Sequence, residues 1–223
     1  MISIYAGYDP NEATVYHTFC NSVIQHSSVP VSFTPLALNN LDFYNNQGRD
    51  GSNQFTYSRF LVPYMSGYTG WSLFCDGDML LLDDVKLLWN LRDDTKAAMV
   101  VKHNYKTKMQ NKYLGAVNED YPRKNWSSVI LFNNALCTAL TPEYVSVATG
   151  ADLHRFRWIK DDLIGELPEE WNWLDIEYDY NPNAKLIHYT LGAPSFDEFA
   201  HSGSYSKHWH IENQKTWYCK QHE

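Results

Sequence analysis

The fold is decided by the opening of the chain, ISIYAG at residues 2–7, together with the β-rich stretch at residues 29–38. The short apolar run at residues 2–6 ends at a glycine and predicts a buried strand. Between the two stretches, residues 12–26 carry apolar side chains at helical spacing, after an Asp-Pro-Asn turn at residues 9–11 that suits a helix start. Strand, helix and strand in this order predict an α/β protein with a parallel sheet.

The same apolar patterns continue along the chain. They predict further strands at residues 71–75, 97–101, 127–132 and 185–189, and helices at residues 56–65, 85–91, 141–148 and 155–167. Residues 39–53 and 103–126 lack a clear period, and we expect loops there, the second of them functional. Because we find no repeat or linker, we expect one domain over residues 1–223, with the polar and aromatic tail at 201–223 wrapping it.

Composition argues against several classes of protein. Eighteen Lys and Arg against 26 Asp and Glu give a formal charge of −8, whereas nucleic-acid binding needs a basic face. No run approaches the roughly 18 apolar residues of a membrane helix, and the N-terminus does not resemble a signal peptide. The four cysteines are expected to be reduced core thiols, because they form no CxxC pair: Cys20, Cys75, Cys137 and Cys219. We therefore expect a soluble, cytoplasmic protein.

Asp76-Gly77-Asp78 is the segment that carries chemistry, because it follows the apolar run at 71–75 directly. Two carboxylates at the end of a buried strand are costly without a counter-charge. Ligands of α/β sheets bind outside the carboxyl ends of strands, and a hard dication completed by a diphosphate would neutralise both acids. The glycine lets the backbone turn sharply between them. An isolated Asp-x-Asp is a weak signal, since it occurs in many surface loops.

Six segments in a fixed order extend this signal. They are IYAGYD at 4–9, TYSRF at 56–60, FCDGDMLLL at 74–82, VILFN at 129–133, DDLIGELP at 161–168 and LIHYTLG at 186–192. In order and spacing they resemble the family-8 glycosyltransferases, which include glycogenin and bacterial lipopolysaccharide galactosyltransferases. The resemblance implies a GT-A fold, which is a Rossmann-like, mixed and mainly parallel sheet flanked by helices.

The resemblance also implies a reaction and its participants. Mn²⁺ (or Mg²⁺) would be held by Asp76, Asp78 and His188, and two oxygens with a nitrogen suit Mn²⁺ better than Ca²⁺. A hexose would move from a UDP-sugar to a carbohydrate or other hydroxyl acceptor, with retention. Asp161 or Asp162 would stabilise an oxocarbenium-like transition state, and the sequence does not choose between them.

Donor binding is implied for a further set of residues. Ala6 and Asp9 would contact the base and ribose, Arg59 the donor, and an asparagine the donor sugar. The full implied set is Ala6, Gly7, Asp9, Arg59, Asp76, Gly77, Asn133 and Gly192.

The sequence departs from the family pattern at two places. A family lysine that contacts the β-phosphate shortly after the closing glycine is replaced here by APSF at residues 193–196, and Lys207 is a candidate substitute. Four lysines of the 103–126 region and its edge could also steer an anionic ligand: Lys102, Lys106, Lys108 and Lys112. Near residue 161, Asp stands where the family often has Gln. Because the family lysine is missing, a nucleotide-sugar-binding module without turnover is the alternative.

Two other enzyme classes fit the sequence less well. A haloacid-dehalogenase-type phosphotransferase needs its nucleophilic Asp on the first strand, whereas Asp76 follows several elements. A nucleotidyltransferase usually opens with a Gly-rich basic phosphate loop, and GYDP at residues 7–10 is not one.

Overall fold

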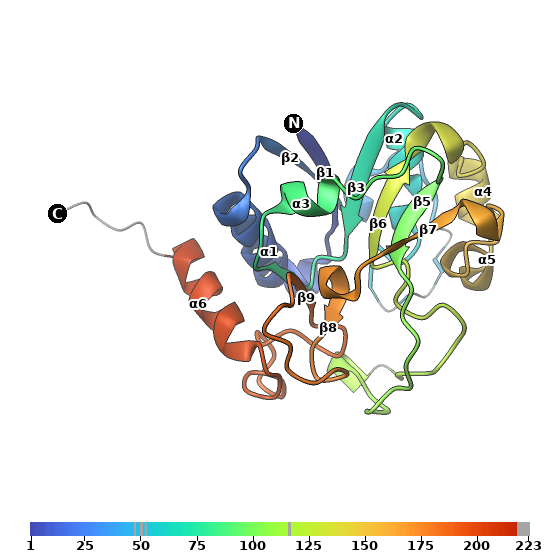
Figure 1. Ribbon diagram of the computed structural model, residues 1–223. Helices are drawn as coiled ribbons and strands as arrows, with labels where there is room; N and C mark the ends of the chain where they lie inside the picture. The colour runs from blue at the N-terminus through green and yellow to red at the C-terminus, as the bar shows by residue number, and fades with distance from the viewer. Residues whose placement is uncertain (47, 50, 52, 116, 218–223) are drawn as a thin grey trace.

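The computed structural model describes residues 1–223 except 47, 50, 52, 116 and 218–223. Within this part of the chain, six strands form the main sheet in the order β2-β1-β3-β6-β5-β7 (Figure 1). They are β1 (Ile2–Gly7), β2 (Val31–Leu36), β3 (Trp71–Cys75), β5 (Ala98–Val101), β6 (Val129–Asn133) and β7 (Ile164–Leu167). Strand β6 runs antiparallel to β3 and β5, and the other neighbours are parallel. The sheet is thus mixed and mainly parallel, as the resemblance implied.

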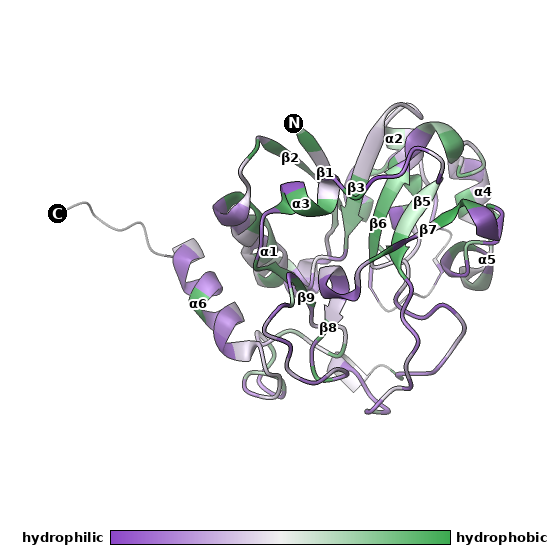
Figure 2. Ribbon diagram, in the orientation of Figure 1, coloured by the Kyte–Doolittle hydropathy of each residue, from purple (hydrophilic) through white to green (hydrophobic). Residues whose placement is uncertain are grey.

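Helices cover both faces of this sheet. They are α1 (Ala13–His26), α2 (Val62–Met65), α3 (Val85–Trp89), α4 (Pro142–Val147) and α5 (Gly150–His154), while α6 (Ser206–Trp217) packs on α1. Because side chains alternate along a strand, Leu73 of β3 packs with α1 and α3, while its neighbour Phe74 packs with α2, α4 and α5. Figure 2 shows the hydrophobic residues concentrated on the central strands and the hydrophilic ones on α6 and the loops.

A second, smaller sheet determines where the distant parts of the site meet. Its strands are β4 (Met79–Leu81), β9 (Leu186–His188) and β8 (Trp173–Leu174), in the order β4-β9-β8. Strand β4 pairs antiparallel with β9, so that Met79 lies opposite His188. The backbone N–H of Tyr189 donates to the carbonyl of Asp78 at 2.9 Å. This pairing carries His188 to the Asp-Gly-Asp segment across more than 100 positions of sequence.

The predicted strands are present, but the helix predicted at residues 155–167 is wrong. The chain turns after α5, forms a 3₁₀ turn at Asp161–Leu163 and continues as strand β7. Ile164 and Leu167 are buried, and β7 pairs in parallel with β5. Sheet pairing and burial therefore override the helical spacing. The helix predicted at 56–65 is a 3₁₀ helix, Ser58–Leu61, followed by the short α2.

The tail contributes helix α6, which lies against α1. Asn213 Nδ2 donates to Thr18 Oγ1 at 2.8 Å, and Asn21 Nδ2 donates to Glu212. Residues 218–223, with Cys219, lie outside the described residues, and the other three cysteines are free thiols. Among the described helices, none combines the length and apolar character needed to cross a membrane.

Candidate metal-binding site

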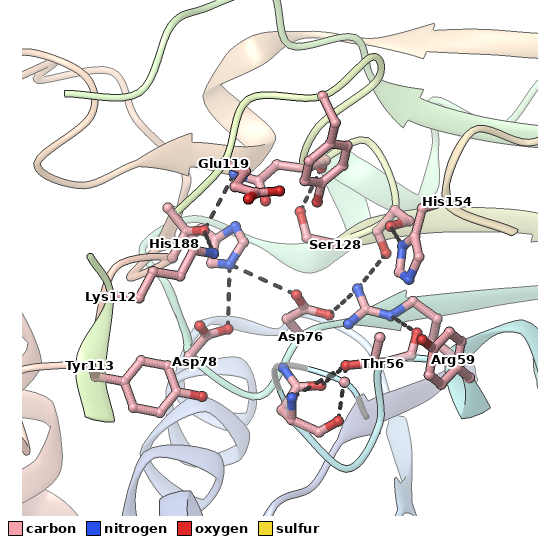
Figure 3. A pocket seen from close by; sticks show the side chains of 17 residues that line it. Thr56, Arg59, Asp76, Asp78, Lys112, Tyr113, Glu119, Ser128, His154 and His188 are labelled. Atoms are coloured by element: carbon pink, nitrogen blue, oxygen red, sulfur yellow. Dashed lines mark hydrogen bonds and ion pairs between the residues drawn. The ribbon is translucent and has the colours of Figure 1, made fainter. Parts of the chain in front are cut away.

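Two carboxylates and an imidazole meet where β3 ends and the small sheet begins. Nε2 of His188 lies 3.4 Å from Oδ1 of Asp78 and 3.8 Å from Oδ2 of Asp76 (Figure 3). One ligand atom from each of the three residues lies within 4.8 Å of the others, and all three residues are buried. Ligands at about 2.0–2.2 Å from a shared ion lie roughly 3 Å apart. A small contraction would therefore bring these three atoms onto one cation.

Asn172 fixes the orientation of the His188 ring. Its Oδ1 lies 3.1 Å from Nδ1 of His188, and its Nδ2 donates to Ser128 Oγ at 2.8 Å and to the Asn125 carbonyl at 3.3 Å. With its amide N–H groups engaged there, Asn172 presents its oxygen to the imidazole. Nδ1 therefore carries the proton, and the lone pair of Nε2 faces the carboxylates. A hydrogen bond of this kind typically orients a metal-ligating histidine.

Arg59 holds the first carboxylate from the opposite side. Its Nη1 lies 2.7 Å from Oδ1 of Asp76 and donates to the Ser127 carbonyl at 3.0 Å, while its Nε donates to the Thr56 carbonyl at 3.1 Å. Burial raises the pKa of Asp76 to about 6, and the attraction of Arg59 offsets only part of this increase. The remaining cost of ionising Asp76 would be reduced by a bound cation.

Burial raises the pKa of Asp78 less than the attraction of His188 and Lys112 lowers it, so Asp78 ionises more readily than Asp76, but one of its oxygens lacks a donor. Its buried Oδ1 receives no hydrogen bond from any residue that the structure describes. A buried carboxylate oxygen without a donor is costly unless it is coordinated. The donor set, the orientation of His188 and this unsatisfied oxygen together fit a divalent cation.

The three residues form part of the wall of a cavity of about 510 Å³, within the roughly 300–1,000 Å³ typical of small-molecule sites. Its walls come from β9, from segments that adjoin the ends of the strands, from α5 and from the 103–126 loop. They include Thr56, Tyr57, Arg59, Asp76, Asp78, Lys112, Tyr113, Asn125, Ser127, Ser128, His154, His188 and Thr190. Figure 3 shows Lys112 and His188 on one side of Asp76, and Arg59 with His154 on the other. The candidate metal-binding group of Asp76, Asp78 and His188 thus lies among polar cavity residues, with Lys112 on one side of Asp76 and Arg59 and His154 on the other.

Lys112 supplies a positive charge beside the acidic pair. Its Nζ donates to Thr190 Oγ1 at 3.3 Å. Burial lowers the pKa of this lysine, against the attraction of Asp78 and Asp76. Among the described residues, no carboxylate lies within ion-pair distance of Nζ. Lys207, the substitute suggested by the sequence, is exposed on α6 and is not among the residues that line the cavity within the described chain.

The implied nucleotide-binding residues lie at the end of β1, next to the Asp-Gly-Asp segment. A Cβ at Gly77 would overlap the carbonyl oxygen of Gly7, so the close approach of the two segments requires glycine at position 77. Ala6 is buried in the sheet, opposite Cys75. Asp9 accepts from the backbone N–H of Asn11 at 2.9 Å and of residue 54 at 3.0 Å. Asp9 thus ties the turn after β1 to the loop that contains Gln54.

The remaining implied residues do not line the cavity. Asn133 pairs with Trp71, the first residue of β3, so it lies at the end of the strand remote from Asp76. Gly192, with a φ of +154°, would clash through a Cβ with the Phe199 ring. Asp161 and Asp162 are exposed at the start of β7, where Asp161 pairs with Arg123 at 2.7 Å. In the described chain these four positions are absent from the cavity wall, as are Ala6, Gly7, Asp9 and Gly77.

The cavity also contains residues that the sequence did not single out. Ser127 and Ser128 precede β6, and because this strand is antiparallel, its beginning and not its end faces Asp76. The sequence signal was present, as two hydroxyl residues directly before the apolar run VILF. Asn172 and His154 had no such signal, since each looked like an ordinary polar residue near a helix or turn.

Known structures share this fold, although no protein-family profile matches the chain. The galactosyltransferase LgtC, solved in complex with donor and acceptor sugar analogs, is 14% identical, with a TM-score of 0.62 over 99% of this chain and 98% of that one. The WbbM bifunctional glycosyltransferase, in its apo structure, is 16% identical, with a TM-score of 0.60 over 95% of this chain. This chain spans 51%, about half, of the WbbM chain. The protein therefore has the GT-A fold of family-8-type glycosyltransferases.

One relative is much more similar in sequence than these solved structures are. Protein CDI of Arabidopsis thaliana is 42% identical over 205 residues, which cover 87% of this chain and 79% of that protein. The chain belongs to the same family as Protein CDI.

Proposed function

We propose that this chain, as one domain over residues 1–223, is a metal-dependent glycosyltransferase that moves a hexose from a UDP-sugar to a hydroxyl acceptor with retention. The observation that carries the proposal is the buried group of Asp76, Asp78 and His188 in the wall of the cavity. Two oxygens and an imidazole nitrogen favour Mn²⁺, with Mg²⁺ as the alternative. When bound, such an ion acts as a Lewis acid that disperses the charge on the departing diphosphate.

Neighbouring side chains hold the candidate metal ligands in position before the donor binds. Arg59 and Asn172 hold Asp76 and His188 in place, so that little reorganisation is needed when the donor binds. The nucleoside would lie toward Ala6 and Asp9, at the end of β1, as the family resemblance implies. The sugar would then occupy the part of the cavity beyond Asp76.

Lys112 supports a diphosphate as the central ligand. It is a partly buried ammonium beside a metal-binding group, and its described hydrogen bond goes to a neutral hydroxyl. We propose that it contacts the diphosphate and so replaces the lysine missing after Gly192. A cation in this position would favour the charged leaving group.

In the proposed donor complex, Asp161 and Asp162 do not contact the donor. Both are exposed, and Arg123 already pairs with Asp161. We therefore do not assign the carboxylate that would stabilise the transition state.

UDP release from a panel of UDP-sugars, measured with Mn²⁺ and again with EDTA, tests the function. We expect metal-dependent release with at least one donor, because many transferases slowly hydrolyse their donor when no acceptor is present. If the chain binds UDP tightly with Mn²⁺ but releases no UDP from any of the donors, with or without a hydroxyl acceptor, the nucleotide-sugar-binding module is supported instead. Absence of both binding and release would refute the proposal.

A further inference from the structure

The cavity continues past Asp76, away from Lys112 and His188. His154 of α5 lies at that end (Figure 3), and the buried Ser127, which hydrogen-bonds His154, also lines the cavity. The carbonyl of Ser127 accepts from Nη1 of Arg59, the same nitrogen that pairs with Asp76. Ser127 is therefore joined to the metal-binding group through one guanidinium.

The side chain of Ser127 hydrogen-bonds an imidazole. Its Oγ lies 2.7 Å from Nδ1 of His154, and the position of the single ring proton decides which of the two atoms donates. With that proton on Nε2, Nδ1 accepts from the Ser127 hydroxyl. The oxygen of Ser127 then has lone pairs to offer to a ligand, while its proton is engaged.

His154 keeps this arrangement across the usual range of assay conditions. Burial lowers the pKa of His154 to about 3, and the positive charge of Arg59 acts in the same direction. The ring is therefore neutral near pH 7, and Nδ1 remains an acceptor.

Ser128 repeats the pattern beside it. Its hydroxyl donates to the Asn125 carbonyl at 2.7 Å, and its oxygen accepts from Asn172 Nδ2 at 2.8 Å. Both serine protons are thus committed to the protein. This wall presents oxygen acceptors to the cavity, which complements a ligand rich in hydroxyl donors and disfavours an anionic group.

We infer that Ser127 is a specificity-determining residue, whose Oγ accepts a hydrogen bond from a hydroxyl of the transferred sugar, and that His154 is the positioning residue that orients it. The inference rests on the proposed function, because it takes the diphosphate to lie at the metal-binding group. A sugar attached to that diphosphate must extend along the cavity. With the nucleoside toward β1, the Ser127 end is the part that remains for it.

Calorimetry with Mn²⁺ tests the contact, by comparing UDP with each UDP-hexose that the wild type binds. We expect Ser127→Ala to lower the affinity for the UDP-hexose about tenfold, the effect of losing one buried hydrogen bond to a ligand. The affinity for UDP should not change. Ser146→Ala is the matched control, because Ser146 lies on α4 outside the cavity wall and donates to the Pro142 carbonyl.

A pair of variants at position 154 separates positioning from simple structural support. His154→Asn keeps an oxygen acceptor close to the place of Nδ1 and should retain most of the preference for the UDP-hexose over UDP. His154→Leu removes the acceptor and should lose that preference as Ser127→Ala does. Circular dichroism and melting temperature must show that each variant folds, and a Ser127→Cys variant replaces Ser127→Ala if the latter does not.

The outcomes distinguish a failure of the role of Ser127 from a failure of the proposed function. If the wild type binds UDP with Mn²⁺ and Ser127→Ala leaves the affinity for every bound UDP-hexose unchanged, the role of Ser127 is refuted and the proposed function stands. If the wild type binds neither UDP nor any UDP-hexose with Mn²⁺, both are refuted. Equal loss of UDP and UDP-hexose affinity in Ser127→Ala would also refute a contact to the sugar.

Discussion

Two acidic pairs of this chain lie in opposite surroundings. Asp76 and Asp78 are buried in the cavity wall, with His188 and Arg59 around them. Asp161 and Asp162 are exposed at the start of β7, and the side chain of Asp161 is 76% accessible. Burial raises the pKa of Asp76 to about 6, whereas the hydrogen bond and charge of Arg123 lower the pKa of Asp161.

The difference shows what makes a pair of acids a binding site. In water, ionised carboxylates need no partner, and an exposed ion pair contributes little. In a buried wall the same groups are held at a cost, which a cation can relieve. The buried pair is therefore prepared for a ligand, while the exposed pair is satisfied as it stands.

The largest expected effect comes from removing a carboxylate of the buried pair. Asp78→Ala should reduce Mn²⁺-dependent UDP binding by more than about 100-fold, because a metal site loses one of its ligands. The matched change in the exposed pair, Asp162→Ala, should leave binding within about twofold of the wild type. Calorimetry with UDP and Mn²⁺ measures both, and circular dichroism checks the fold. Unchanged affinity in Asp78→Ala would contradict the metal assignment.

A smaller effect is expected for the cation beside the buried pair. Lys112→Ala should weaken UDP binding roughly 10- to 100-fold, as expected for loss of a charged hydrogen bond. It should weaken uridine binding far less, since uridine has no phosphate. Lys207→Ala, on the exposed surface of α6, should weaken neither. Equal affinities of Lys112→Ala and the wild type for UDP would show that another group contacts the diphosphate.

The smallest effect concerns stability and has opposite signs for the buried Asp175 and the exposed Asp161. Burial raises the pKa of Asp175 from 3.8 to about 6, although backbone N–H groups of Ile176, Tyr205 and Ser204 act in the opposite direction. The contribution of Asp175 to the free energy of unfolding is therefore fully present below its unfolded pKa and is lost as pH rises through about 6. For Asp161, whose pKa is lowered, the contribution is present above 3.8 and is lost as pH falls.

Urea unfolding at a series of pH values measures this contrast. Relative to Asp175→Asn, the wild type should lose stability as pH rises between 3.8 and about 6. Relative to Asp161→Asn, it should lose stability as pH falls below 3.8. The stability difference between wild type and variant should change with pH in opposite directions for Asp175→Asn and Asp161→Asn. A change in the same direction would contradict the proposed difference between the environments of these two acids.

Local sequence was sufficient for most of the strands and for part of the site. The strand at 71–75 matches its predicted bounds, because a run of apolar side chains buried on both faces is distinctive. Asp76, Asp78 and His188 do converge, as the family resemblance implied. The sequence failed at residues 155–167, where helical spacing gave no sign that Ile164–Leu167 would join the edge of the sheet.

The sequence by itself determined that β1, α1 and β2 begin an α/β fold and that two carboxylates follow a buried strand, because periodicity and local charge are properties of neighbouring residues. Only the tertiary structure decided which distant groups complete the site. The direction of β6 brought Ser127 to the cavity, the pairing of β4 with β9 brought His188, and the path of the 103–126 loop brought Lys112. Strand direction, pairing and loop path follow from the packing of the whole chain, so no local pattern encodes them.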